Sequence, residues 1–435
     1  MSARAALLVR GFAKIALAAS VAVSAALVAA PAGAHPGGPG GPGGPGNQDG
    51  PGGPGRPAPG DPPGPGHEHG PGHPPGPGHD HGPGQHPGPG GPGGPGGPGG
   101  PGGPGGPGGP GSPAECGLTI TASFTLGNDL DCAGGVAITI DADESTGDTI
   151  VLDLARHTVS GHGTGIGVFV DMYENTERPT VVIRNGTVRG FDTGIGGDGF
   201  STLQIADIAL RDNRQWFGGG YESQIIEVDR AQIIDSGRGG AFIEVKLTVR
   251  RSQFVRSSID SSSESWTYVY DSTFVGGGIS TGAASSLIAE RNTFTQCDTG
   301  ITMIDSWTFS PTVLRGNKFI GCQTGADLRL LLIGDGPNAV TIVDNHFTGN
   351  SGDGLHIEAL TPTGEINVVG NHANRNGGDG ISGSGSGLTT LTRNHANHNG
   401  GHGIDMTDVV DGGGNVAHGN QTEPQCVGVV CTTHP

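Results

Sequence analysis

Four side chains in the C-terminal half of the chain combine residue types that can do acid and base chemistry. Asp327 and His356 are 29 residues apart, and the same interval separates Arg329 from Glu358. A carboxylate beside an imidazole could serve as a general acid/base pair, and an arginine could hold a carboxylate of a substrate. The alternative is ordinary charge pairing between neighbouring strands on a solvated surface.

A second group of residues could bind a metal ion. Asp353 and Asp379 each precede a glycine, and His402 precedes the next glycine of the series. Two stacked carboxylates could share a Ca²⁺ ion, although an aspartate before a turn glycine is common without any metal. A further column could chelate zinc or form a stack of exposed imidazoles without a ligand; it consists of His346, His372 and His395.

Aromatic side chains suggest a third kind of chemistry. Tyr268 and Tyr270 flank Val269, which is predicted to point inward, so both rings should point outward. Four more aromatic residues are expected in longer insertions of the chain: Trp216, Tyr221, Trp266 and Trp307. Rings exposed along one side can stack on the apolar faces of sugars, so these six side chains are predicted to contact a carbohydrate. The alternative is that each insertion folds its ring down as a plug.

These residues are positioned by a repeat of roughly 20 to 29 residues that begins after Ala114. Each copy reads apolar, x, apolar, x, x, Asn, x, apolar, and a Gly-apolar pair follows eight or nine residues after the Asn. Alternating apolar residues predict short strands with one buried side, and the period is too short for a crossover helix. Successive copies must therefore pair along one axis, as the coils of a parallel β-helix.

Eleven copies align, and the Asn position has a structural explanation. Asn tolerates the left-handed backbone conformation of a tight corner, and stacked amides can hydrogen-bond to the coils above and below. In chain order the position is occupied by His157, Gly186, Ala206, Ala231, Ser252, Ser272, Asn292, Asn317, Asn345, Asn371 and Asn394. Phe347, two residues after one of these Asn residues, is predicted to be buried.

A second column lies five residues further along in each copy. It reads Cys297, Cys322, Asn350, Asn376, Asn399 and Asn420. At the spacing of neighbouring coils, Cys297 and Cys322 could form a disulfide or a stacked pair of buried thiols.

With this repeat, the chain resembles the right-handed parallel β-helix proteins related to the pectin-lyase-like superfamily, over roughly residues 130 to 420. The stretch TIVLDLARHTVSGHGTGIG and the ending GGGNVAHGNQTEPQCVGVVC are similar to terminal segments of secreted bacterial members of undefined activity. The resemblance implies an all-β solenoid of about 11 coils. It implies no particular reaction, because the superfamily includes lyases, epimerases, hydrolases and proteins with no known catalysis. The dense cluster of acidic Ca²⁺ ligands with a basic residue, which a lyase would need, is not recognisable.

The chain is predicted to divide into three segments. Residues 1–34 carry basic residues, an apolar stretch and a small-residue cleavage site, which indicates a signal peptide. Residues 35–113 are almost entirely Gly and Pro with scattered His, and they are predicted to form a disordered arm. A collagen-like helix is the alternative for the arm, and its histidines could bind metal loosely. Residues 114–435 are predicted to form the β-helix domain.

Export has consequences for the cysteines and for the location. Cys116 with Cys132, and Cys426 with Cys431, lie at the two ends of the ordered domain and are predicted to be disulfides. We expect a secreted protein, extracellular or associated with the cell wall, with no membrane insertion.

The formal net charge of −19 argues against nucleic acid as a partner. It also disfavours direct capture of an anionic polysaccharide, unless a divalent cation bridges the two. The main hypothesis is a secreted protein that contacts extracellular or cell-wall polysaccharide through its aromatic side. The alternatives are a polysaccharide lyase, epimerase or glycoside hydrolase that uses Asp327, His356 and Glu358, and a purely structural surface protein.

Overall fold

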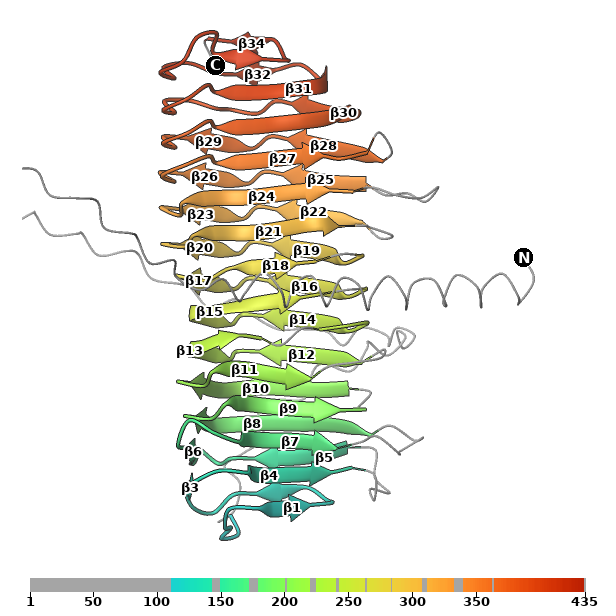
Figure 1. Ribbon diagram of the computed structural model, residues 1–435, viewed down its shortest axis with the longest axis vertical. Coiled ribbons are helices and arrows are strands. Elements are labelled where there is room, and N and C mark those ends of the chain that lie inside the picture. Colours follow the sequence, from blue (N-terminus) through green and yellow to red (C-terminus); the bar gives the residue numbers. More distant parts are fainter. Residues whose placement is uncertain are drawn as a thin grey trace, which may run out of the picture. The chain divides into compact units, whose positions relative to one another are not determined.

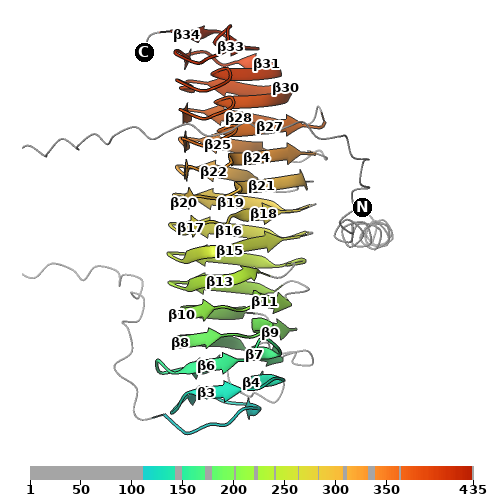
Figure 2. The same cartoon turned by 60° about the vertical axis from the view of Figure 1, so that its left-hand side comes forward.

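The computed structural model is a right-handed parallel β-helix of about 12 turns, which confirms the predicted fold class (Figure 1, Figure 2). The structure describes residues 111–142, 149–171, 179–199, 202–219, 224–239, 242–262, 264–282, 284–306, 311–331, 339–361 and 364–433. Within these ranges every regular element is a strand, and no helix there could span a membrane.

The predicted signal peptide and almost all of the predicted arm lie outside the described residues. The described chain begins slightly earlier than expected, because the last residues assigned to the arm join the first turn. The Ser112 amide donates a hydrogen bond to the Thr125 carbonyl at 2.9 Å.

The strands of successive turns stack into three faces of the coil, which we call faces A, B and C; face C lies on the left in Figure 1. Face A contains β1 (Leu118–Ile120), β4 (Val136–Asp141), β7 (Ile166–Asp171), β9 (Thr193–Asp198), β11 (Gln215–Gly219), β18 (Ile279–Thr281), β21 (Thr299–Ser306), β24 (Thr324–Leu330), β27 (Leu355–Ala359) and β33 (Cys426–Val427). Face B contains β2 (Phe124–Thr125), β5 (Thr149–Asp153), β12 (Ile225–Asp229), β14 (Lys246–Arg250), β16 (Trp266–Tyr270), β19 (Ser286–Glu290), β22 (Thr312–Arg315), β25 (Ala339–Val343) and β28 (Glu365–Val369).

Face C contains β3 (Leu130–Cys132), β6 (Thr158–Gly161), β13 (Gln232–Arg238), β17 (Thr273–Val275), β20 (Thr293–Thr295), β23 (Lys318–Ile320), β26 (His346–Thr348), β29 (His372–Asn374), β32 (Asn415–Val416) and β34 (Cys431–Thr432). Five longer strands bend around a corner and belong to two faces: β8 (Thr180–Arg189), β10 (Thr202–Arg211), β15 (Gln253–Ser261), β30 (Ile381–Thr392) and β31 (Ile404–Asp411). All described strand pairings are parallel except for a single antiparallel contact between Gln215 and Gly237.

Stacked apolar side chains fill the interior. Five phenylalanine rings form a continuous pile with centroids 4.7–4.8 Å apart: Phe254, Phe274, Phe294, Phe319 and Phe347. This interval matches the spacing of hydrogen-bonded strands, so each ring rests on the ring of the next turn. Phe347 is fully buried, which confirms its predicted inward position.

Buried asparagines form the predicted ladder at the corner between faces B and C. The Asn345 Oδ1 atom accepts hydrogen bonds from the backbone N–H and the Nδ2 of Asn317, at 2.9 and 3.0 Å. Its own Nδ2 donates to the Leu314 carbonyl at 2.9 Å and to Asn371 Oδ1 at 3.0 Å. Both donors and both acceptor sites of the amide are therefore used, which makes its burial tolerable.

Two details of the predicted ladder are wrong. The left-handed conformation belongs to the residue before each Asn, as at Asp344, where φ is 54°. That residue makes the corner, and the Asn that follows it points inward. In the turn assigned Ala206, the equivalent residue is Ile208, because Ala209 is in register with Gln232. Ile208 is buried and apolar, so this turn lacks an amide rung.

The three predicted cysteine pairs are disulfides. Cys116 is bonded to Cys132, Cys297 to Cys322 and Cys426 to Cys431. Cys297 and Cys322, for which the sequence left a disulfide and two free thiols open, thus form a disulfide between neighbouring turns. Their Cα atoms are 4.4 Å apart.

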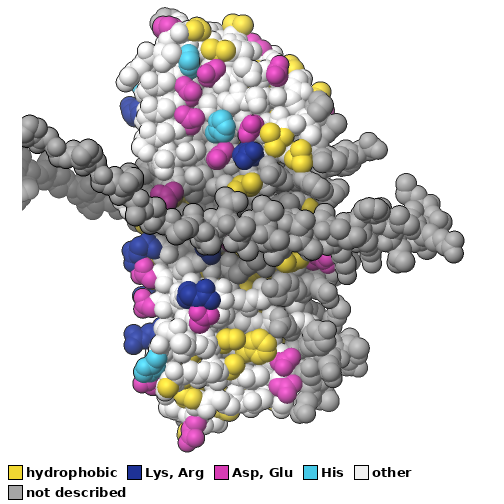
Figure 3. Space-filling view, viewed as in Figure 1, with side chains coloured by type: hydrophobic (Ala, Val, Ile, Leu, Met, Phe, Trp, Pro, Cys, Tyr) yellow, Lys and Arg dark blue, Asp and Glu magenta, His cyan; other side chains and the backbone are white. Residues whose placement is uncertain are grey.

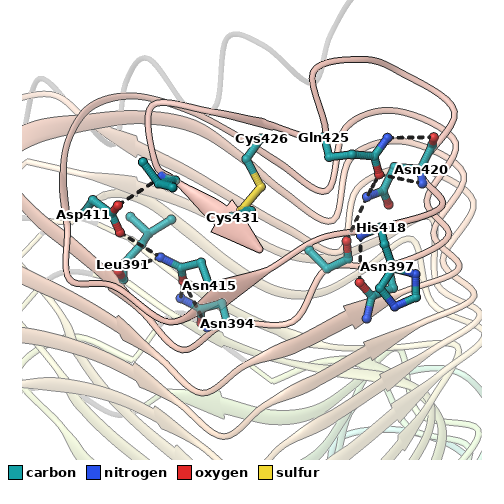
Figure 4. The surroundings of a disulfide bond; sticks show 12 residues. Leu391, Asn394, Asn397, Asp411, Asn415, His418, Asn420, Gln425, Cys426 and Cys431 are labelled. Atoms are coloured by element: carbon teal, nitrogen blue, oxygen red, sulfur yellow. Dashed lines mark hydrogen bonds between the residues drawn. A yellow bond between two sulfur atoms is a disulfide. The ribbon is translucent and has the colours of Figure 1, made fainter. Parts of the chain in front are cut away.

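Asn350, Asn376, Asn399 and Asn420 form a second amide ladder. Both ladders end on side-chain acceptors beside the last disulfide (Figure 4). Asn415 Nδ2 donates to Asp411 Oδ1 at 3.2 Å, and Asn420 Nδ2 donates to Gln425 Oε1 at 2.8 Å. These acceptors replace the asparagine that another turn would have provided.

Candidate functional site

Polar and charged side chains gather on the upper part of face A, over β24, β27, β30 and β31 (Figure 3). The members of this group, which we call the face A patch, are Asp327, Arg329, Asp353, His356, Glu358, Asp379, Ser382, His402 and Asp405. The strand register places Asp327 next to His356, His356 next to Ser382, and Arg329 next to Glu358. The predicted neighbours therefore do lie side by side.

A hydrogen-bonded chain fixes the orientation of His356. Ser382 Oγ donates to Asp353 Oδ2 at 2.7 Å and lies 2.9 Å from His356 Nδ1. Because a carboxylate can only accept and the hydroxyl has one proton, His356 Nδ1 must donate to Ser382. The neutral imidazole then has its lone pair on Nε2, the arrangement that a general base needs. Asp327 stands beside it, and its Oδ1 atom is among the described buried side-chain atoms without a hydrogen-bond partner.

Arg329 and Glu358 form the charge pair that was the alternative interpretation. Arg329 Nε donates to Glu358 Oε2 at 3.1 Å, and both side chains are nearly half exposed. An exposed pair of this kind contributes on the order of 0 to 1 kcal/mol. Arg329 is therefore partly engaged, and it can hold a substrate carboxylate only by sharing or releasing Glu358.

The metal-capable group in the described structure differs from the predicted pair of aspartates. Donor atoms of Asp379, His402 and Asp405 all lie within 4.8 Å of one another. Asp353 instead accepts hydrogen bonds from the Asp379 backbone N–H at 2.8 Å and from Ser382. Partial burial, with Asp353 and Asp405 as negative neighbours, raises the pKa of Asp379 above its usual value. Two carboxylates and an imidazole are a plausible donor set for a divalent cation.

The histidine column on face C is a stack of parallel rings. The centroids of His346, His372 and His395 are separated by 5.0 and 4.9 Å, with interplanar angles of 6° and 15°. Rings stacked in this way do not converge on one ion, because two nitrogens bound to the same zinc lie about 2 Å from it. The structure thus favours the interpretation of this column as a stack without a metal.

Strand β16 presents three aromatic side chains on the outer side of face B. Trp266 is 41% exposed, Tyr268 and Tyr270 are partly exposed, and the intervening Thr267 and Val269 are buried. We call the three outward residues the aromatic strand. At about 3.3 Å per residue, the outer two Cα atoms are roughly 13 Å apart.

Cations on the neighbouring strand β14 hold two of these rings. Lys246 Nζ lies 5.7 Å from the Tyr268 ring centroid, and the Arg250 guanidinium lies 5.5 Å from that of Tyr270. Both distances fall within cation–π range. Partial burial, together with the carboxylate of Glu290, raises the pKa of Tyr270, which therefore stays neutral at physiological pH.

The predicted exposure of Trp216 is wrong, and two other predicted contacts cannot be placed. Trp216 is fully buried in β11, where its ring packs against Phe217, Phe242 and Phe254. Its indole Nε1 donates to the Ser258 carbonyl at 3.0 Å. Tyr221 and Trp307 lie outside the described residues.

Sequence reasoning missed a depression of about 940 Å³ on the lower part of face C. Its lining includes Arg189, Arg211, His162 and Asp131, which come from four strands or the turns beside them. The signal was present in the repeat, because Asp131, Ser160, Arg189 and Arg211 occupy the same outward column of successive turns.

Comparisons with known proteins concern the fold. A family model described as the right-handed beta helix region matches residues 145–362. No curated protein matches the chain. Solved structures with similar folds include a double mutant of the periplasmic alginate epimerase AlgG, with 13% identity, a TM-score of 0.41, and coverage of 67% of this chain and 82% of that one.

Two further solved structures are similar to this chain. The mannuronan C-5 epimerase AlgE4 A-module of Azotobacter vinelandii has 15% identity and a TM-score of 0.27, covering 68% of this chain and 79% of that one. The catalytic unit of a GH87 α-1,3-glucanase from Streptomyces thermodiastaticus has 12% identity and a TM-score of 0.26, and the match covers 67% of this chain and 63% of that one. At these values the structures indicate no function for this chain.

Proposed function

This chain belongs to the right-handed β-helix family, and from that premise we propose that it is a secreted protein that binds extracellular or cell-wall polysaccharide through the aromatic strand. The observation that carries the proposal is the exposure of Trp266 beside Tyr268 and Tyr270 on one rigid strand. Exposed aromatic rings offer a sugar an apolar platform, while a tyrosine hydroxyl can hydrogen-bond to its polar groups.

The aromatic strand is preorganised for this role. The buried Thr267 and Val269 anchor it to the core, and β14 and β19 hold it on both sides in parallel register. Little backbone freedom is therefore left to lose when a ligand binds, which reduces the entropic cost of association. The three disulfides support export, because disulfides are expected in an oxidising compartment. An exported protein would meet extracellular polysaccharide.

The test compares Trp266→Ala with Ile320→Ala in the full-length protein. Ile320 is 44% exposed on another face, so its truncation removes exposed apolar surface without touching the aromatic strand. A glycan array with and without Ca²⁺ would identify a ligand, and calorimetry would then measure its affinity. We expect Trp266→Ala to weaken binding roughly tenfold or more, and Ile320→Ala to leave it unchanged. Equal affinities for all three proteins would refute the proposal.

A second candidate function is acid/base catalysis on a polysaccharide at the face A patch. It is favoured by the chain from Asp353 through Ser382 to His356, which directs Nε2 of the imidazole away from its partners. In this candidate His356 moves the proton, and Asp327 and Glu358 supply the adjacent carboxylates. The test measures turnover of glycans that the array identifies, using His356→Gln, Asp327→Asn and Glu358→Gln. Glycan binding without turnover by the wild type, or unchanged turnover in His356→Gln, would exclude it.

A further inference from the structure

Two arginines face each other in the depression on face C without a carboxylate partner. Arg189 and Arg211 are directly paired positions of β8 and β10. Their Cα atoms are thus about 4.8 Å apart, and like charges placed opposite one another on neighbouring strands destabilise a sheet. Among the described residues, neither guanidinium forms an ion pair.

Other arginines of the surrounding turns do lie against carboxylates. Arg184 is paired with Asp153, and Arg214 with Asp192. Arg256, two turns above Arg211, is paired in the same way with Asp235. The nearby acidic groups Asp192 and Asp235 are therefore occupied, and the exposed Asp212, which follows Arg211 in the chain, forms no ion pair with either arginine among the described residues.

The two guanidiniums are held apart by neutral partners. Arg189 Nε donates to Ser160 Oγ on the strand below at 3.4 Å, whereas Arg211 donates to Gln232 Oε1 on the strand above at 2.8 Å. Each guanidinium has five N–H donors, so most of them remain available. Thr158, Thr187 and Ser160 add hydroxyl groups to the lining of the same depression.

The acidic end of the depression lies at a distance from the arginines. Asp131 is two strands below Arg189, or roughly 10 Å at the usual strand spacing. Asp131 is hydrogen-bonded to His162 at 2.8 Å, and Asp129 is hydrogen-bonded to His157 at 3.1 Å. These carboxylates are thus engaged with their own partners and leave the arginine end positive.

We propose that the depression on face C is a binding site for an oxyanion of an acidic glycan, a sulfate ester or a carboxylate, held between Arg189 and Arg211. An oxyanion there would neutralise the facing charges and accept charge-assisted hydrogen bonds from both forks. The hydroxyls of the lining would meet the sugar hydroxyls around it. This site lies on a different face from the aromatic strand and does not rest on the function proposed for it.

Because the whole protein is acidic, binding of a polyanion would point to a local binding site. With a formal net charge of −19, the chain repels a polyanion unless a local site holds it. The full-length protein is titrated at low salt with dextran sulfate, with polygalacturonate and with uncharged dextran. Dextran and dextran sulfate share one backbone, so their difference reports the anionic group, and the two acidic polymers separate a sulfate from a carboxylate.

The variant is Arg189→Gln with Arg211→Gln, and the control is Arg375→Gln with Arg393→Gln. The control removes the same charge from two exposed arginines of other turns, which form no ion pair in the described structure. We expect the wild type and the control to bind at least one acidic polymer but not dextran. The first variant should bind roughly tenfold more weakly or worse. Thermal unfolding checks that both variants fold, and the two single variants substitute if the double variant does not.

Three results would overturn the proposal. They are failure of the wild type to bind either acidic polymer, equal affinity of the wild type and the Arg189/Arg211 variant, and an equal loss in the control. The last result would mean that overall charge, and not the facing pair, governs the interaction.

Discussion

The amide ladder makes a quantitative prediction at Asn345, which lies in the middle of the column and is fully buried. Replacement by alanine removes the Oδ1 atom that accepts from both the backbone N–H and the Nδ2 of Asn317. It also removes the Nδ2 donor to the Leu314 carbonyl and to Asn371.

The loss of stability depends on which buried groups are left without any hydrogen-bond partner. Asn317 Nδ2 keeps one bond to the Ala289 carbonyl at 2.8 Å, and Asn371 Oδ1 still accepts from the Asn345 backbone N–H at 3.0 Å. The substitution therefore leaves two N–H bonds of Asn317 without an acceptor in a buried place. At about 1 to 3 kcal/mol for each buried unsatisfied group, Asn345→Ala should reduce the free energy of unfolding by about 2 to 6 kcal/mol.

The assay is equilibrium unfolding in urea, followed by circular dichroism, with the slope of each transition compared before midpoints are converted to free energies. Asn367→Ala is the matched control, because Asn367 lies on the outer side of face B and is only partly buried. The control should stay within about 0.5 kcal/mol of the wild type. If Asn345→Ala behaved like the control, the buried amides would have no stabilising role and the explanation of the corner would be wrong.

Two other substitutions test the interior and the histidine stack. Phe347→Ala leaves a cavity at the end of the ring pile beside Phe319 and should cost about 3 to 5 kcal/mol in the same urea assay; a near-neutral result would contradict the stacked core. Burial, and then the neighbouring His346, lowers the pKa of His372 below the usual value of a histidine. The unfolded chain therefore binds this proton more readily, so the free energy of unfolding should fall as the pH drops below about 6.5. His372→Gln should lessen that fall between pH 7.5 and pH 5.5, and an unchanged pH dependence would show that the stack has no part in it.

The neighbours on the outer surface were predictable because the same sequence interval separates the members of two pairs. The spacing that relates Asp327 to His356 also relates Arg329 to Glu358, and regular stacking converts equal sequence intervals into equal heights. The position of Trp216 was not predictable in this way. Consecutive residues Trp216 and Phe217 are both buried, and the same buried pair recurs in β4 and β7. In those strands the position of Trp216 is occupied by Ala137 and Gly167, so the repeat gives no reason to expect a buried tryptophan there.

The repeat pattern also could not predict the direction of the hydrogen bond between His356 and Ser382. The sequence places Ser382 beside His356, but the tautomer of the imidazole depends on Asp353, which occupies the turn before β27. Similarly, aligned columns put Arg189 beside Arg211, yet only the positions of the surrounding carboxylates show that neither is neutralised. In both cases the decisive fact is which neighbouring group is already engaged.

The aromatic strand and the pair Arg189 and Arg211 lie on different faces, and this has a testable consequence. Inward residues are tied to the turns above and below by ring stacking and amide ladders, so truncating an outward side chain disturbs few of the contacts that hold the coil. Trp266 is on face B and Arg211 is on the outer side of face C, and β12 and β14 separate their turns. Their effects on the binding of one acidic glycan should therefore add when Trp266→Ala and Arg211→Gln are combined. If one of the single effects vanished in the double variant, a single polymer would have to bridge the two faces around the corner.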